Sequence, residues 1–309
     1  MLFNDRNKSK AIVILILFTV LFTTIISGEV TRDYEGTDFH RHMIKAQGNC
    51  DNIDSNVWNV ESCKVYRPLL GFLGSPFSGS GEQFAIFGFL LIGVLIPIAL
   101  FWITKHWVTV LFYFTTTNFF YAHIDGIYAQ ALATLFVILM LGTKKWQFEL
   151  GFLVLATLSH GHGLELGVLV LLAKYLPKAF LACSGTFGKG TPGVFEQKLP
   201  AIGGVNPTVG SLIHPFVRII PLPFLLLGTY QNIKDKKTEL VLITIIGIVA
   251  GFTLSSRAMF IASVPMIIGL TSYYVANQKK WGKHLIVGAL LMGVYQLYAY
   301  LNLKACVAL

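Results

Sequence analysis

Residues 84–103, FAIFGFLLIGVLIPIALFWI, form one apolar run without a single charge. A second run, residues 11–27 (AIVILILFTVLFTTIIS), has the same character. Each is close to the roughly 20 residues that an α-helix needs to cross a bilayer. Because further apolar stretches follow along the chain, the pattern predicts an all-α fold, a polytopic transmembrane bundle of about 8–10 helices.

The composition excludes several other classes of protein. Of the 309 residues, 54% are hydrophobic and only 13% are charged, about half the charged share of a soluble domain. A soluble enzyme, a fibrous protein and a disordered chain are therefore excluded. The net charge of +9 comes from clusters between apolar runs, as in cytoplasmic loops of membrane proteins. The net charge therefore indicates how the chain is oriented in the membrane, with a cytoplasmic N-terminus. It does not point to a nucleic-acid partner. The clusters are Arg6, Lys8 and Lys10; Lys144 and Lys145; Lys234, Lys236 and Lys237; and Lys279, Lys280 and Lys283.

The acidic residues gather elsewhere, in residues 28–83. This segment follows the first apolar run and carries more than half of the 15 Asp and Glu residues. We expect it to be a large extracytoplasmic loop. It also contains Cys50 and Cys63, a candidate disulfide pair in an oxidising compartment, although two free thiols fit the sequence equally well.

The charge rule predicts most of the crossings within a single membrane domain spanning residues 1–309. Residues 146–177 are ambiguous, because they fit either one long broken helix or two short helices meeting near His160. We favour one crossing, since it leaves the Gly- and Pro-rich residues 178–212 as an extracytoplasmic loop and agrees with the downstream charges. The other expected helices are 11–27, 84–104, 107–122, 127–142, 215–230, 239–255, 258–276 and 284–303.

Asp38 is the first candidate for catalysis. If Asp38 caps a helix running to about Gln47, His42 lies one turn further along the same face. A carboxylate there serves as a general base or binds a cation, and an imidazole orients it or contacts phosphate. His40 lies between the two. The plainer interpretation is a helix cap in a solvated loop.

Two further polar positions interrupt apolar segments on the expected outer side. His123 and Asp125 lie in a short turn, where Asp125 is a second candidate acid or a closing turn residue. His160 and His162 form an HxH pattern beside Glu165, either a weak metal-site signal or a polar break between helices.

Arg218 and Arg257 each begin an apolar helix at its expected outer end. A guanidinium fork suits phosphate or pyrophosphate. Arginine at a helix end also commonly extends to lipid headgroups.

Together these features resemble the GT-C class of integral-membrane glycosyltransferases, which use dolichyl- or polyprenyl-phosphate sugars. The resemblance rests on Gly36-Thr37-Asp38-Phe39-His40 after the first helix and on Tyr66-Arg67-Pro68-Leu69-Leu70, which is similar to a Tyr-Pro-Pro-Leu run. The turn with His123, Asp125 and Gly126, the run Leu158-Ser159-His160, and Ser256-Arg257 before a helix with Pro265 are also similar. Asp38 stands alone where paired acids are common in the class.

The resemblance implies transfer of a sugar from a lipid-phosphate donor to a glycan, lipid or protein acceptor outside a cytoplasmic or ER-like membrane. Asp38 would deprotonate the acceptor hydroxyl. Asp125 and His123 would assist or bind a divalent cation, Mg²⁺ or Mn²⁺, which Asp38 could share. Arg257 and Arg218 would stabilise the leaving phosphate, and His40, His42 and His160 would contact substrate.

Two alternatives belong to other functional classes. One is a membrane metal-dependent hydrolase using Asp38, His42, His160 and His162. The other is a non-enzymatic scaffold or a transporter, although transporters bind their substrates near the midplane, whereas these polar groups lie toward one face.

Overall fold

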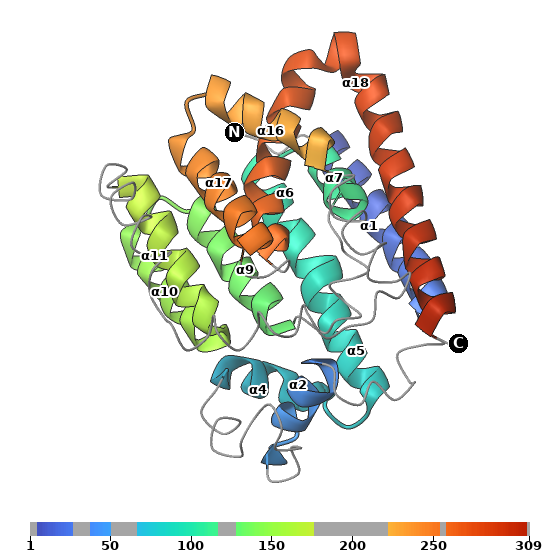
Figure 1. Ribbon diagram of the computed structural model, residues 1–309, viewed down its shortest axis with the longest axis vertical. Helices are drawn as coiled ribbons and strands as arrows, with labels where there is room; N and C mark the ends of the chain where they lie inside the picture. Colours follow the sequence, from blue (N-terminus) through green and yellow to red (C-terminus); the bar gives the residue numbers. More distant parts are fainter. Residues whose placement is uncertain are drawn as a thin grey trace. The chain divides into compact units, whose positions relative to one another are not determined.

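The computed structural model describes residues 5–26, 38–50, 67–116, 128–175, 222–253 and 258–307. All regular elements in those ranges are helices (Figure 1), as predicted. One helical run, Gly81–Thr104, has the length (24 residues) and composition to cross a membrane. The polytopic arrangement and the number of crossings stay predictions.

The chain divides into two compact units. Unit 1 comprises Met1–Phe114 and Phe119–Val168, and unit 2 comprises Thr115–Asn118 and Leu169–Leu309. The single membrane domain spanning residues 1–309 stays a prediction.

Unit 1 contains the predicted helices of the N-terminal half. The apolar run 11–27 forms α1, 84–104 forms the continuous series α5–η3–α6, and 127–142 forms α9. The bounds are α1 Asp5–Ile26, α2 Asp38–Ala46, α4 Pro68–Gly74, η2 Ser75–Phe77, α5 Gly81–Phe89, η3 Leu90–Leu95, α6 Ile96–Thr104, α7 Val108–Thr116, α9 Tyr128–Gly142, α10 Trp146–Ser159 and α11 Gly161–Tyr175; the ends of α7 and α11 belong to unit 2.

A π-helical segment, η3, interrupts the long helix just before Pro97. In a π-turn the carbonyl of Ile92 would accept from the amide five residues later. That residue is Pro97, which has no N–H. The buried hydroxyl of Tyr113 on α7 donates to the Ile92 carbonyl instead, at 2.7 Å. Tyr113 thus replaces a backbone donor that the sequence removed.

We therefore expect Tyr113→Phe to lower the free energy of unfolding by about 1–3 kcal/mol, because a buried carbonyl loses a partner. Thermal unfolding of the purified protein in detergent measures this. Tyr230→Phe is the matched control, since the Tyr230 side chain is 57% exposed. Equal stability of the two variants would contradict this role of Tyr113.

The helices α10 and α11 form an antiparallel hairpin that turns at His160. A Cβ on Gly163 would lie 2.0 Å from the Ala156 carbonyl oxygen, and one on Gly167 would lie 2.3 Å from Leu153 Cδ1. Only a reversed chain brings these residues together, and Figure 1 shows the two helices side by side. The favoured single crossing over 146–177 is therefore wrong, because these glycines let the helices pack closely. Residues 178–212 lie outside the described residues.

Gly163→Ala is expected to destabilise the hairpin by roughly 1–3 kcal/mol, since the new methyl group would overlap the α10 backbone. Gly151→Ala is the matched control, because a Cβ at Gly151 has no atom within 4 Å. The control should be neutral or slightly stabilising through its higher helix propensity. Thermal unfolding in detergent compares the two. If both variants unfold at the same temperature, the close approach is not stabilising.

Unit 2 is built on α16 (Leu222–Lys234), α17 (Thr238–Thr253) and α18 (Ala258–Val307). A Cβ on Gly228 would lie 1.9 Å from the Met266 carbonyl oxygen, so α16 and α18 touch through their backbones. The Asn232 side-chain amide donates to the Pro265 carbonyl at 2.8 Å. The long α18 breaks at Asn277 (φ −116°, ψ 15°) and changes direction there (Figure 1). This agrees with the two helices predicted at 258–276 and 284–303.

Candidate functional site

The site in unit 1 is centred on Arg67, the residue immediately before α4. Arg67 has left-handed backbone angles (φ 59°, ψ 52°) and Pro68 follows it. Both features are unfavourable, since a side chain at positive φ costs energy and a residue before proline avoids helical angles. The Arg67 side chain is nevertheless buried. Such local strain persists only where the surroundings hold it in place, and it clusters at functional sites.

Two histidines from distant parts of the chain hold the Arg67 guanidinium. Its Nη1 donates to Nε2 of His42 on α2, and its Nη2 donates to Nε2 of His160 at 3.0 Å. Both imidazoles are buried, His42 completely. Because an arginine can only donate, each Nε2 must be unprotonated, which assigns the ring proton to Nδ1 of both histidines. Two neutral imidazoles thus orient one buried cation.

His160 reaches this position because it terminates α10. Its backbone is extended (φ −162°, ψ 145°), and its N–H donates to the Ala156 carbonyl. The Gly163 N–H donates to the His160 carbonyl at 2.7 Å as α11 begins. The turn of the hairpin therefore presents the imidazole to Arg67.

Lys45 adds a second buried cation beside Arg67. It lies one turn after His42 on α2, and its side chain runs along α4, 3.5 Å from the place of a Cβ on Gly71. Burial lowers the pKa of the Lys45 ammonium, and the positive charge of Arg67 lowers it further. Both effects oppose the charged form, and an anion entering the site would offset both.

The backbone of α2 places Asp38 close to this cluster. The helix begins at Asp38, as predicted, so Asp38 lies one turn before His42 on the same face. The Gln47 amide donates to the Ser78 carbonyl at 2.7 Å, which fastens the end of α2 to the segment leading into α5. The side chains of Asp38 and His40 lie outside the described residues.

Cys50, which follows α2, is buried and disulfide-bonded. Its predicted partner Cys63 lies outside the described residues, so the pairing stays a prediction. A disulfide is typical of an extracytoplasmic compartment.

The structure brings His42 and His160 together, and it supplies two residues that sequence reasoning did not propose for the site, Arg67 and Lys45. The signal for Arg67 was its place in Tyr66-Arg67-Pro68, where it stands at the position of the first proline of the Tyr-Pro-Pro-Leu run. For Lys45 the sequence offered no signal beyond its spacing from His42. Four predicted residues lie outside the described residues: His123, Asp125, Arg218 and Arg257.

A metal site does not emerge in the part of the chain that the structure describes. It contains no group of three His, Cys, Asp or Glu side chains able to hold an ion. The Nε2 atoms of His42 and His160, which could serve as ligands, both accept from the Arg67 guanidinium. A cation is unsuited to this position, whereas an anion suits it.

Comparisons of the chain with protein-family models, with curated proteins and with solved structures find no match.

Proposed function

We propose that this protein is a polytopic membrane glycosyltransferase of the GT-C class. It transfers a sugar from a lipid-phosphate donor to an acceptor on the extracytoplasmic side. The observation that carries the proposal is the buried Arg67 guanidinium, which His42 and His160 hold. On α2, His42 follows Asp38 by one helical turn. A fixed cation stabilises a leaving phosphate and a carboxylate deprotonates a hydroxyl, so Arg67 and Asp38 are the two kinds of group that such a transfer requires.

In this mechanism Asp38 accepts the proton of the acceptor hydroxyl. The acceptor oxygen forms a bond to the anomeric carbon while the bond from that carbon to the phosphate oxygen breaks. The lipid phosphate leaves with the electron pair and gains negative charge. Arg67 and Lys45 stabilise that charge, and the two imidazoles keep the guanidinium oriented before substrate arrives, which reduces the cost of positioning it.

Exposed apolar side chains support a membrane location for each unit. On α1, Ile12, Val13, Ile16, Leu17 and Val20 are each at least 54% exposed. In unit 2, the second half of α18 exposes Val287, Leu290, Leu291 and Val294. Continuous apolar surface of this kind marks contact with a membrane or a partner.

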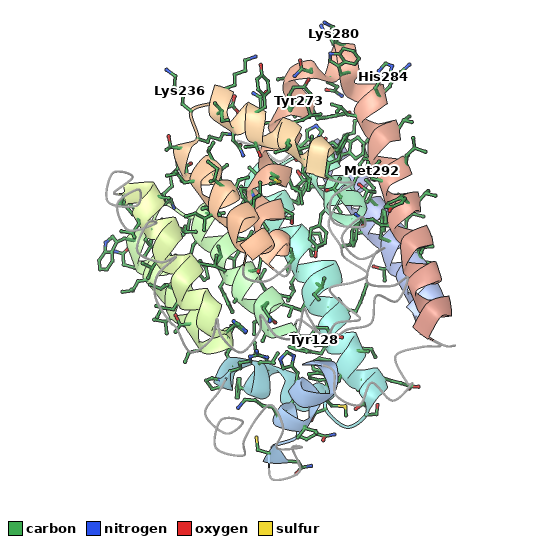
Figure 2. All side chains as sticks on the ribbon, viewed as in Figure 1. Tyr128, Lys236, Tyr273, Lys280, His284 and Met292 are labelled. Carbon is green, nitrogen blue, oxygen red and sulfur yellow. The ribbon has the colours of Figure 1, made fainter. Side chains whose placement is uncertain are left out.

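The basic clusters support the proposed orientation. In unit 2, Lys236 and Lys280 lie at the same end (Figure 2), as the positive-inside rule requires of two cytoplasmic turns. In unit 1, the α10–α11 hairpin starts next to Lys145 and reverses at His160. We therefore propose that His160 lies outside and that Tyr175 is back at the cytoplasmic side.

A transfer assay tests the function directly. The purified full-length chain is reconstituted in liposomes with a panel of polyprenyl-phosphate hexoses, once with Mg²⁺ or Mn²⁺ and once with EDTA. Release of polyprenyl phosphate is followed with glycan, lipid and peptide acceptors, and liposomes without protein serve as the blank. We expect protein-dependent release from at least one donor. No release from any donor by correctly inserted protein would contradict the proposal.

A further inference from the structure

A second basic cluster lies at the opposite end of unit 1 from Arg67. The helical run that begins at Gly81, after α4, ends at Thr104, so about 35 Å of helix separates its two ends. Lys105 ends α6 with left-handed angles (φ 57°, ψ 21°), and the turn 105–107 leads into α7. The hydroxyls of Thr104 and Thr109 hydrogen-bond across this turn at 2.6 Å.

The first turns of α1 complete the cluster. The Asn7 side-chain amide donates to the Lys105 carbonyl at 3.4 Å. The Lys10 ammonium lies 5.1 Å from the ring centroid of Trp107, and the Lys105 ammonium lies 5.1 Å from that of Trp102. Both are cation–π distances. Lys10 of α1 therefore lies against Trp107, beside His106, while Lys105 and Trp102 pair with each other on the same 102–107 segment.

The surroundings of this cluster disfavour the charged forms of His106 and Lys105. Burial lowers the pKa of His106, and the positive charge of Lys10 lowers it further. Burial also lowers the pKa of Lys105. The Val108 N–H donates to Nδ1 of His106 at 3.3 Å, so the neutral ring carries its proton on Nε2 and can donate there. Asp5, the acid in the first turn of α1, is exposed and pairs with Lys8 at 3.7 Å.

We propose that Lys10, Lys105 and His106 form a binding site for the phosphate of an acidic lipid headgroup, with Trp102 and Trp107 as anchors at the level of the headgroups. Tryptophan and lysine gather at the membrane–water interface. Trp102 is 42% exposed, and Ile12, Val13 and Ile16 leave an apolar surface on α1 immediately beyond Lys10. A lipid matches both the cations and the apolar surface, since its phosphate contacts the cations while its acyl chains cover α1. A free phosphate would meet the cations only.

This inference rests on the membrane location proposed above and not on the transfer chemistry. Native mass spectrometry of the full-length chain in detergent measures lipid binding, with dioleoyl phosphatidylglycerol and dioleoyl phosphatidylcholine supplied in equal amounts. We expect bound phosphatidylglycerol to predominate. The double variant Lys10→Gln/Lys105→Gln should lose roughly twenty-fivefold in phosphatidylglycerol affinity, since each lysine near an anionic surface contributes about fivefold.

Two further variants control for net charge and for folding. Lys279→Gln/Lys283→Gln removes the same charge from exposed positions in unit 2 and should keep the lipid preference. Lys10→Arg/Lys105→Arg keeps the charges in place and should also keep it. Inorganic phosphate in excess should not displace the lipid. Three results would each overturn the proposal: no preference in the unaltered chain, an equal loss in the unit 2 variant, or displacement by inorganic phosphate. Donor turnover, measured separately, reports on the proposed function alone.

Discussion

Asp38→Asn should abolish sugar transfer while insertion and thermal stability stay unchanged. An amide has nearly the shape of the carboxylate but cannot accept the proton of the acceptor hydroxyl. General-base catalysis contributes about 10²–10⁴-fold to the rate, and we expect kcat to fall by that factor. Release of polyprenyl phosphate from the donor identified with the unaltered chain measures the effect.

Glu82→Gln is the matched control for that experiment. Glu82 is an exposed acid in the first turn of α5, on the same side of unit 1 as Asp38. Glu82→Gln removes one negative charge, as Asp38→Asn does. Its kcat should stay within about twofold of the unaltered value. A loss confined to KM in the Asp38 variant would show that Asp38 binds substrate and does not accept the proton. Unchanged activity would exclude both roles.

Arg67→Met should combine a loss of donor binding with a loss of stability. The change removes the cation that the leaving phosphate is proposed to meet, so we expect kcat/KM to fall by at least about a hundredfold, equivalent to about 3 kcal/mol of lost transition-state stabilisation. It also removes the hydrogen bonds to His42 and His160. Each hydrogen bond to a charged group contributes about 1.5–3 kcal/mol. The donor assay and thermal unfolding measure the two effects separately.

Arg67→Lys separates the charge from its geometry. A lysine keeps the positive charge, but its single ammonium group lacks the planar fork that reaches two imidazoles at once. We expect the activity of Arg67→Lys to be lower than that of the unaltered chain and higher than that of Arg67→Met. Arg6→Met, which replaces an exposed arginine on α1, is the control and should leave both measurements nearly unchanged. Unaltered donor affinity in Arg67→Met would remove the guanidinium from the proposed mechanism.

Local signals predicted most of the helices. The expected helix 127–142 is α9, Tyr128–Gly142, and the expected helix 239–255 corresponds to α17, Thr238–Thr253. The expected start of a helix at Asp38 is also observed. These predictions succeed because apolar runs, charges at their ends and capping residues act within a few residues of the chain.

The hairpin at His160 was the main error. Hydropathy is the same for one crossing and for two helices that reverse, because it counts apolar residues and not direction. The decision depends on whether two backbones can touch, and Gly163 and Gly167 allow this against α10. The downstream charges favoured one crossing because it leaves residues 178–212 outside, and that loop stays a prediction.

The sequence by itself determined that the described chain is helical, where helices such as α9 and α17 begin and end, and that Asp38 and His42 share one face of a short helix. These properties follow from local periodicity. Only the tertiary structure decided that Arg67 joins His42 and His160, which are 25 and 93 residues away from it along the chain. That contact requires α2, the left-handed start of α4 and the end of α10 to meet. Such a meeting depends on packing between distant segments, on which no local pattern carries information.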